Sequence, residues 1–248
     1  MKKMNIYKSI LKNKKLNKKL FAVLIDPDKI RITDLKKISQ KCQESNVDFI
    51  FVGGSLLTNN IFDECISTIK KSCLVPVVIF PGNIMQINNE ADAILFLSLI
   101  SGRNADMLIG KHVITAPILK KSNIEVIPTG YMLIESGILT SVAYISNTIP
   151  IPHDKDDIAL CTALAGEMLG LKIIFLEGGS GAFNPVSEKM IARVSNNVNI
   201  PVIVGGGIKT PDKAIKDCKA GADIIVVGNA IEFDSTLINE ISDAIHGL

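Results

Sequence analysis

Short apolar runs recur along the chain, and each is followed by a turn signal and then by a pattern of helical period. None of these runs alternates apolar with polar residues. Continuous apolar runs are typical of strands that are buried on both faces, as in a parallel sheet covered by helices. The pattern predicts eight strands, at Phe21–Ile25, Phe49–Val52, Val77–Phe80, Ala93–Leu97, Ile124–Ile127, Lys172–Phe175, Pro201–Val204 and Asp223–Val227.

The segments between the strands carry apolar residues at helical spacing. In residues 33–45, Thr33 is placed to cap such a helix, and near the end of the chain Thr210 caps another that Gly221 would close. A strand followed by a helix, repeated about eight times in ~250 residues, is typical of a (β/α)8 or TIM-type barrel. No GxGxxG motif follows the first run, which disfavours an open dinucleotide-binding sheet. We therefore expect a TIM-type barrel of class α/β.

One connection departs from this rhythm. About two dozen residues, 130–153, separate the fifth run from a helix expected near Asp154, and they are largely apolar. Loops of this length are usually functional or disordered, and the apolar content argues against disorder. On a barrel this segment would lie at the C-terminal face, where active sites sit. No linker rich in Gly, Ser or Pro divides the chain, so residues 1–248 are expected to form one domain.

The start of the chain is strongly basic. Eight of the 27 basic residues lie within residues 1–19, which contain no acid, and apolar residues recur among them at Ile6, Ile10, Leu11 and Leu16. We interpret residues 1–19 as an amphipathic helix that packs on the barrel with its lysines in water; attraction to anionic membrane lipids is the alternative. The segment lacks the apolar stretch and cleavage site of a signal peptide.

Composition excludes several classes. Hydrophobic residues make up 47% and charged residues 21%, which is enough for a sizeable core and excludes general disorder. No apolar run is long enough to span a bilayer. Nucleic acid is a poor candidate partner, because the basic charge is confined to one segment and only 5% of residues are aromatic. Five scattered cysteines without a CxxC pair, and three histidines without ligand spacing, argue against a zinc site or disulfides and favour the cytoplasm.

Glycine-rich turns follow the last three predicted strands. Gly206 and Gly207 come after the seventh and Gly228 after the eighth, at the place where barrels commonly bind phosphate through backbone N–H groups. Residues 178–181 form a similar turn after the sixth. These turns predict a phosphorylated ligand; the alternative is that the glycines only make tight turns.

Carboxylates lie beside these turns. Glu177 precedes the 178–181 turn, and a carboxylate next to a phosphate suggests a grip on hydroxyl groups or acceptance of a proton, with a purely stabilising role as the alternative. Asp26 and Ser55 end the first two strands and together suit a Mg²⁺ ion that keeps most of its water, although Asp-Pro-Asp is also a common turn. Two anion sites beside an apolar loop suggest two phosphorylated substrates, one of them apolar.

A set of motifs in one order carries a resemblance over almost the whole chain after the lysine-rich segment. They are Asp26-Pro-Asp-Lys29, Val52-Gly-Gly-Ser55, Phe80-Pro-Gly82, Leu176-Glu-Gly-Gly-Ser-Gly181, Val204-Gly-Gly-Gly-Ile208 and Gly228-Asn229. This set resembles the geranylgeranylglyceryl phosphate synthase family, and the Pro150-Ile-Pro152 loop is similar to that of the family's second group. The resemblance implies a prenyltransferase that joins an all-trans prenyl diphosphate, geranylgeranyl diphosphate by the family's name, to the C3 hydroxyl of sn-glycerol 1-phosphate. The product would be an ether-lipid precursor.

The resemblance also implies roles for individual residues. Asp26 and Ser55 would bind Mg²⁺. In the mechanism that the charges then suggest, Glu177 would be catalytic and Tyr131, with the apolar loop, would contact the prenyl chain. The glycerol 1-phosphate would be bound by Phe175, Leu176, Glu177, Gly178, Gly179, Ser180, Gly181, Gly206, Gly207, Gly228 and Asn229. Phe175 stands where the family usually has tyrosine, so one hydroxyl contact would be lost. A homo-oligomer, either a dimer or a hexamer, is expected from the same resemblance.

Two other functions fit the phosphate loops. A phosphosugar isomerase, epimerase or lyase on the same barrel would need an acid–base pair or a Schiff-base lysine at the strand ends, where the candidates are Asp26, Asp28, Glu177 and Lys209. A non-catalytic phospholigand-binding or assembly protein is the second. Mg²⁺-dependent turnover separates that second alternative from the enzymes.

Overall fold

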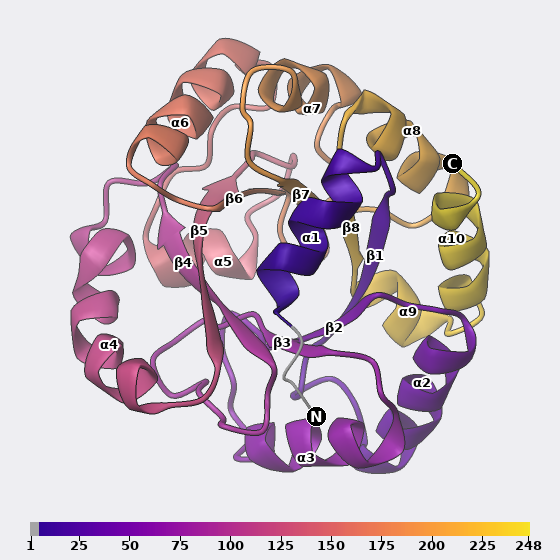
Figure 1. Cartoon of the computed structure of the whole chain (residues 1–248). Coiled ribbons are helices and arrows are strands. Elements are labelled where there is room, and N and C mark those ends of the chain that lie inside the picture. Colours follow the sequence, from indigo (N-terminus) through magenta and orange to yellow (C-terminus); the bar gives the residue numbers. More distant parts are fainter. Residues whose placement is uncertain (1–4) are drawn as a thin grey trace.

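Eight parallel strands close into a barrel in the computed structural model, which describes residues 5–248 (Figure 1). Each strand pairs in parallel with the next along the chain, and the eighth pairs with the first. The strands are β1 (Leu20–Ile25), β2 (Phe49–Val52), β3 (Val77–Ile79), β4 (Ala93–Leu99), β5 (Glu125–Leu133), β6 (Ile173–Glu177), β7 (Val202–Gly205) and β8 (Ile224–Val227). The predicted TIM-type barrel is confirmed.

Most helices surround the barrel, whereas α1 lies across one end of it, as Figure 1 shows. They are α1 (Ile6–Lys15), α2 (Ile32–Glu44), α3 (Phe62–Ser72), a π-helical turn η1 (Asp106–Gly110) that runs into α4 (Lys111–Lys121), α5 (Ser141–Ser146), α6 (Asp156–Met168), α7 (Glu188–Ser195), α8 (Pro211–Ala220), α9 (Asn229–Phe233) and α10 (Leu237–His246). No helix in this described part of the chain is long and apolar enough to cross a membrane.

The strands are apolar on both sides because they separate two cores. One core fills the barrel interior and includes Ala22 of β1 and Phe175 of β6. The other lies between the strands and the helices and includes Val23 of β1 and Leu176 of β6. Neighbouring residues thus point to opposite faces, each against an apolar layer. This double burial produces the continuous apolar runs seen in the sequence.

Helix α1 packs on the barrel as the amphipathic pattern predicted. Ile6 and Ile10 are buried in the interior cluster, together with Leu20 at the start of β1. The carboxylate of Glu125 accepts hydrogen bonds from the backbone N–H groups of Ile6, at 2.5 Å, and Tyr7, at 3.1 Å. These bonds satisfy N–H groups that a helix start otherwise leaves without a partner. Leu20 is the first residue of β1, so α1 covers the N-terminal end of the barrel strands. The glycine-rich turns lie at the opposite end.

The lysines of this segment lie largely in water. Lys8, Lys12, Lys15 and Lys18 are exposed, whereas Lys14 forms an ion pair with Asp223 at 2.9 Å. Leu16, which the apolar pattern assigned to the packed face, follows the helix and is 57% exposed. Lys2 and Lys3 belong to the same prediction but lie outside the described residues.

Two local predictions were wrong. Thr33 was expected to cap its helix, but α2 begins one residue earlier, at Ile32, with Arg31 at the cap position and no side-chain cap bond. Residues 130–153 were expected to form a loop. Instead, β5 continues to Leu133, α5 occupies six of the later residues, and Ile151 forms a bridge with Ile134. At the other end of the chain, Thr210 caps α8 and Gly221 ends it with a φ of 118°, as predicted.

Candidate active site

Five polar or aromatic side chains lie together at one end of the barrel, and strand alternation places four of them there. Glu177 shares the inward face of β6 with Phe175, two residues before it. The same period of two leads from the inward residues of β1, β3 and β5 to Asp26, Phe80 and Tyr131, whereas Ser55 lies three residues beyond the end of β2. All five residues line one polar pocket at the C-terminal end of the strands.

The polar pocket combines these side chains with the glycine-rich turns. Of the residues predicted to act in catalysis or binding, Asp26, Ser55, Tyr131, Glu177, Gly179, Ser180, Gly181, Gly206, Gly207, Gly228 and Asn229 line it. The sequence motifs, which are more than 200 residues apart at their extremes, are therefore brought together around one cavity. Three predicted residues, Phe175, Leu176 and Gly178, do not line it.

These three have other places in the fold. Phe175 is fully buried and stacks on Phe80 with ring centroids 5.2 Å apart, and its edge meets Tyr131 at 5.6 Å. Leu176 points into the layer between barrel and helices. The N–H of Gly178 donates to the carbonyl of Gly205 at 3.0 Å, so this donor is already engaged. Phe175 therefore contributes ring packing to the barrel interior and no polar contact to the pocket.

Close backbone approach explains Gly206. Its φ is +84°, and a Cβ there would lie 2.5 Å from Oε1 of Glu177 and 2.7 Å from the backbone nitrogen of Gly179. Only glycine accepts both this conformation and this proximity. The turn after β7 therefore lies directly against the Glu177 carboxylate.

Glu177 is a buried carboxyl group among the described residues that line the pocket. It is 5% exposed, and Oε1 accepts a hydrogen bond of 2.7 Å from the N–H of Gly179. Burial raises the pKa of this carboxyl to about 7, and the bond from Gly179 opposes that rise only in part. A carboxylate with a pKa near neutrality is suited to accept a proton during a reaction.

Asp26 and Ser55 fit a hydrated Mg²⁺ ion. Both line the polar pocket. The carboxylate of Asp26 lies against Gly54, the residue before Ser55: a Cβ on Gly54 would lie 2.9 Å from Oδ1 of Asp26. No group of three or more His, Cys, Asp or Glu suited to a metal occurs within residues 5–248. Mg²⁺ commonly takes one or two protein oxygens and completes its shell with water and substrate phosphates. A carboxylate and a hydroxyl are donors of the required kind.

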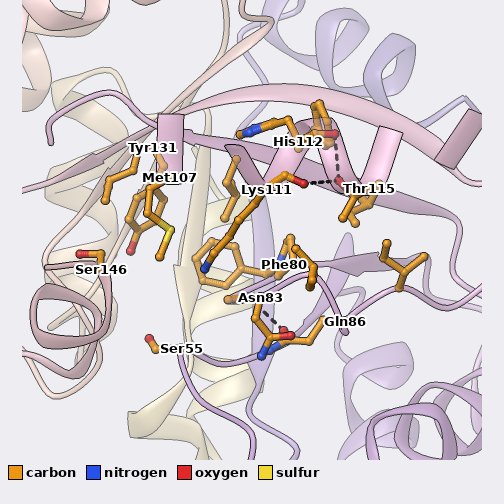
Figure 2. Close-up of a pocket in the computed structure, with 18 of the residues that line it drawn as sticks. Ser55, Phe80, Asn83, Gln86, Met107, Lys111, His112, Thr115, Tyr131 and Ser146 are labelled. Atoms are coloured by element: carbon orange, nitrogen blue, oxygen red, sulfur yellow. Dashed lines mark hydrogen bonds between the residues drawn. The ribbon is translucent and has the colours of Figure 1, made fainter. Parts of the chain in front are cut away.

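A second, mostly apolar pocket adjoins the first and lies between β3, β4 and α4 (Figure 2). Both pockets are lined by Gly54, Ser55, Phe80, Tyr131 and Val142. Farther from the shared residues, the apolar pocket is lined by Ile87, Ile94, Phe96, Leu97, Leu99, Met107 and Leu119. The two cavities thus meet at the aromatic pair Phe80 and Tyr131, whose rings are 5.9 Å apart.

Lys111 is the one formally charged residue among the described residues that line the apolar pocket. Figure 2 shows its side chain extending toward Phe80. His112 beside it is 8% exposed, its ring meets the edge of Phe96 at 4.3 Å, and burial lowers its pKa, so the imidazole is neutral at pH 7. No carboxylate among the described lining residues balances the ammonium group of Lys111.

Sequence reasoning missed Lys29, Phe80 as a lining residue, Lys111 and His112. Phe80 was recognised only as part of a motif, and Lys29 only as the end of Asp-Pro-Asp-Lys. Nothing local to Lys111 or His112 distinguishes them from other helical residues. Asp28, an acid–base candidate for an isomerase, also lines the polar pocket, but its carboxylate accepts hydrogen bonds from the N–H and hydroxyl of Thr58 and from the N–H of Asn59.

Fold and site together define a (β/α)8 barrel whose mouth joins a polar pocket of glycine-rich turns to an apolar one. The chain belongs to the PcrB family, whose model matches residues 11–245. This membership confirms the resemblance inferred from the motifs.

Curated and solved relatives agree with this family. The chain is 56% identical to the geranylgeranylglyceryl phosphate synthase of Chitinophaga pinensis over 97% of this chain and 96% of that one. It is 54% identical to the enzyme of the same name from Spirosoma linguale, over 96% of each. The crystal structure of (S)-3-O-geranylgeranylglyceryl phosphate synthase from Thermoplasma acidophilum with sn-glycerol-1-phosphate superposes with a TM-score of 0.94 at 34% identity, covering 99% of this chain and 100% of that one.

Proposed function

We propose that this protein transfers a prenyl group, geranylgeranyl by the name of its relatives, from its diphosphate to the C3 hydroxyl of sn-glycerol 1-phosphate. The observation that carries the proposal is the pair of adjoining pockets. One is polar and bordered by glycine-rich turns, the other is apolar, and they meet at Ser55, Phe80 and Tyr131. A polar phosphate ester and a long hydrocarbon chain would each have a matching cavity, with their reactive ends together.

Glu177 is proposed to take up the proton. The oxygen of the C3 hydroxyl forms the new bond to C1 of the prenyl chain, while the bond from C1 to the diphosphate oxygen breaks and its electron pair leaves with the diphosphate. The hydroxyl proton passes to the carboxylate of Glu177. Its pKa of about 7 keeps this group largely ionised at slightly alkaline pH and still basic enough to act.

The prenyl chain is proposed to occupy the apolar pocket. Its hydrocarbon would pack against the apolar lining, and Tyr131 and Phe80 would border the reacting carbon and exclude water from it. Lys111 would face the diphosphate, since an unbalanced ammonium group in an apolar cavity favours an anionic ligand. Ser146 and Asn83 add polar lining to the same pocket.

Asp26 and Ser55 are proposed to hold Mg²⁺. The ion would supply positive charge for the leaving diphosphate. The residues present fit this role, because Asp26 lines the polar pocket and Ser55 lines both pockets, which provides two oxygen donors at the polar side of the junction. Holding both substrates at one mouth would replace a bimolecular encounter by a reaction between neighbours.

The cysteines and the outer face of α4 bear on the cellular compartment and on the oligomeric state. All five cysteines are free and four are buried, which supports a reducing setting such as the cytoplasm. A homo-oligomer is supported by apolar side chains on the outer face of α4: Val113, Ile114 and Ile118 are 66%, 58% and 54% exposed.

The test is product formation from each enantiomer of glycerol phosphate with prenyl diphosphates of several lengths, with and without Mg²⁺. We expect a prenyl ether from the sn-1 enantiomer only, lost on removal of the metal, and detected by mass spectrometry. Absence of product with every donor would refute the proposal and favour an isomerase or a binding protein on the same phosphate turns. The preferred donor would also identify the chain length that the apolar pocket accepts.

A further inference from the structure

Lys29 lies where the predicted metal ligand and the predicted phosphate turns meet. Its ammonium group donates hydrogen bonds of 3.1 Å to Oγ of Ser180 and of 3.1 Å to Oδ1 of Asn229. Ser180 and Asn229 are themselves joined by a bond of 2.9 Å. The same ammonium group is 3.5 Å from Oδ2 of Asp26 and 3.8 Å from Oε2 of Glu232.

The charge balance of the polar pocket makes this position significant. Within the described residues, two lysines, Lys29 and Lys209, line it against four carboxylates, those of Asp26, Asp28, Glu177 and Glu232. A phosphate entering such a cavity is opposed by their charge, so a cation in contact with it is needed. Lys29 is the lysine already in contact with two of the turn side chains, and its own side chain is 41% exposed and therefore reachable.

The backbone holds this lysine in reach of both sites. The N–H of Lys29 donates to the carbonyl of Asp26 at 3.0 Å, which closes the turn after β1. The turn fixes the Cα of Lys29, while its four-carbon side chain remains free to move its charge by a few ångströms. Because the ammonium group already contacts Ser180 and Asn229, a small movement away from Asp26 would require no rearrangement of the barrel.

We propose that Lys29 is a shared counter-ion that binds the phosphate of sn-glycerol 1-phosphate and couples its binding to the metal site. Without ligands, the ammonium group is divided between Asp26 and the phosphate turns. A divalent cation on Asp26 repels it and takes over the charge of that carboxylate, so Lys29 is released toward the phosphate. Each ligand therefore strengthens the binding of the other, as reciprocal linkage requires. This inference rests on the proposed function for the identity of the phosphate ester.

The test uses calorimetric titration of the full chain, which measures binding without turnover. sn-Glycerol 1-phosphate and inorganic phosphate are titrated into the wild type, Lys29→Gln and Lys29→Arg, each with and without Mg²⁺. Lys36→Gln is the matched control, because Lys36 is exposed on α2 and its replacement changes the net charge equally. Thermal unfolding of each variant verifies that it is folded.

We expect Lys29→Gln to weaken glycerol 1-phosphate binding about tenfold or more, because a charge-assisted hydrogen bond is lost. We expect Mg²⁺ to strengthen that binding about fivefold in the wild type and to have no such effect in Lys29→Gln. Lys29→Arg should retain part of the affinity, and Lys36→Gln all of it.

Equal affinity in Lys29→Gln and wild type would overturn the role of Lys29 while leaving the proposed function intact. Strengthening by Mg²⁺ that persists in Lys29→Gln would overturn the coupling. A wild type that binds inorganic phosphate through Lys29 but not glycerol 1-phosphate would refute the proposed substrate and support Lys29 as a phosphate ligand.

Discussion

Glu177 is subject to two opposing requirements. The reaction proposed above needs its carboxylate ionised, whereas its burial between backbone groups of β6 and β7 disfavours the charge and raises its pKa to about 7. Catalysis and stability are therefore expected to respond to pH in opposite directions at this one residue, and each response can be measured separately.

The first prediction concerns activity. Because the base must be deprotonated, kcat should fall about tenfold for each pH unit below the pKa of about 7 and level off above it. Glu177→Gln should lose this dependence together with most turnover, by about a hundredfold or more. A pH–rate profile of both proteins checks the prediction. Near-normal turnover in Glu177→Gln would remove Glu177 from the mechanism.

The second prediction concerns stability. The folded-state pKa of Glu177 lies above the ordinary value of 4.5, so the folded protein binds more protons than the unfolded chain between these values. The free energy of unfolding of the wild type should therefore decrease as pH rises from 4.5 to about 7. Glu177→Gln should be more stable than the wild type at pH 8, by about 3 kcal/mol, and should show a smaller decrease over that interval. Urea unfolding at pH 5 and pH 8 measures both differences.

The third prediction concerns Lys111 in the apolar pocket. Lys111→Met should raise the KM for the prenyl diphosphate about tenfold, since a charge facing the diphosphate is lost, and should leave the KM for glycerol 1-phosphate unchanged. Lys120, exposed on the same helix, provides the control as Lys120→Met. An equal rise in both KM values would indicate a general disturbance of the site and contradict the assignment.

At the scale of secondary-structure elements, sequence patterns located the strands well and one long connection poorly. β1, β2 and β6 are buried on both faces, so their apolar runs are uninterrupted and their positions are evident. β5 contains Pro128 and Gly130, residues that usually end a strand, yet both lie within it. Those local signals concealed the second half of β5, which pairing with its neighbours on both sides maintains.

The residues of the site also fall into two groups, those that the sequence reveals and those that only the fold reveals. Glycine turns such as 178–181 are visible in the sequence because the backbone conformation itself demands glycine. Lysines carry no such local mark. The role of Lys29 depends on Ser180 and Asn229, which are 151 and 200 residues away, and only the closed barrel brings them together.

Substitutions in helix α1 can measure how much its packing on the N-terminal end of the barrel contributes to the free energy of unfolding. Ile10 is 3% exposed in the interior cluster, so Ile10→Ala should reduce the free energy of unfolding by about 2–4 kcal/mol. Lys12→Ala, on the exposed face of the same helix, should change it by less than about 0.5 kcal/mol. Urea unfolding of the two variants makes the comparison. A loss below 1 kcal/mol in Ile10→Ala would mean that α1 contributes little to the folded barrel.

At the scale of the whole molecule, the outer face of α4 is the place to test assembly. If copies of the chain associate through Val113, Ile114 and Ile118, then Ile114→Glu should shift the protein to the monomer in sedimentation velocity, because a charge would be buried without a partner. Leu74→Glu is the control, since Leu74 is 90% exposed just after α3. An unchanged oligomer in Ile114→Glu would place the interface elsewhere.

The contacts of α1 also bear on the order in which the chain folds. This helix is synthesised before every strand of the barrel, but its polar partners come much later: Glu125 lies 119 residues after Ile6, and Asp223 lies 209 residues after Lys14. Contacts of such long range form slowly, because a large loop must first close. On the ribosome, the pair between Lys14 and Asp223 can therefore form only after the residue before β8 has emerged. The many lysines of α1 keep this segment hydrated and discourage it from associating with other nascent chains.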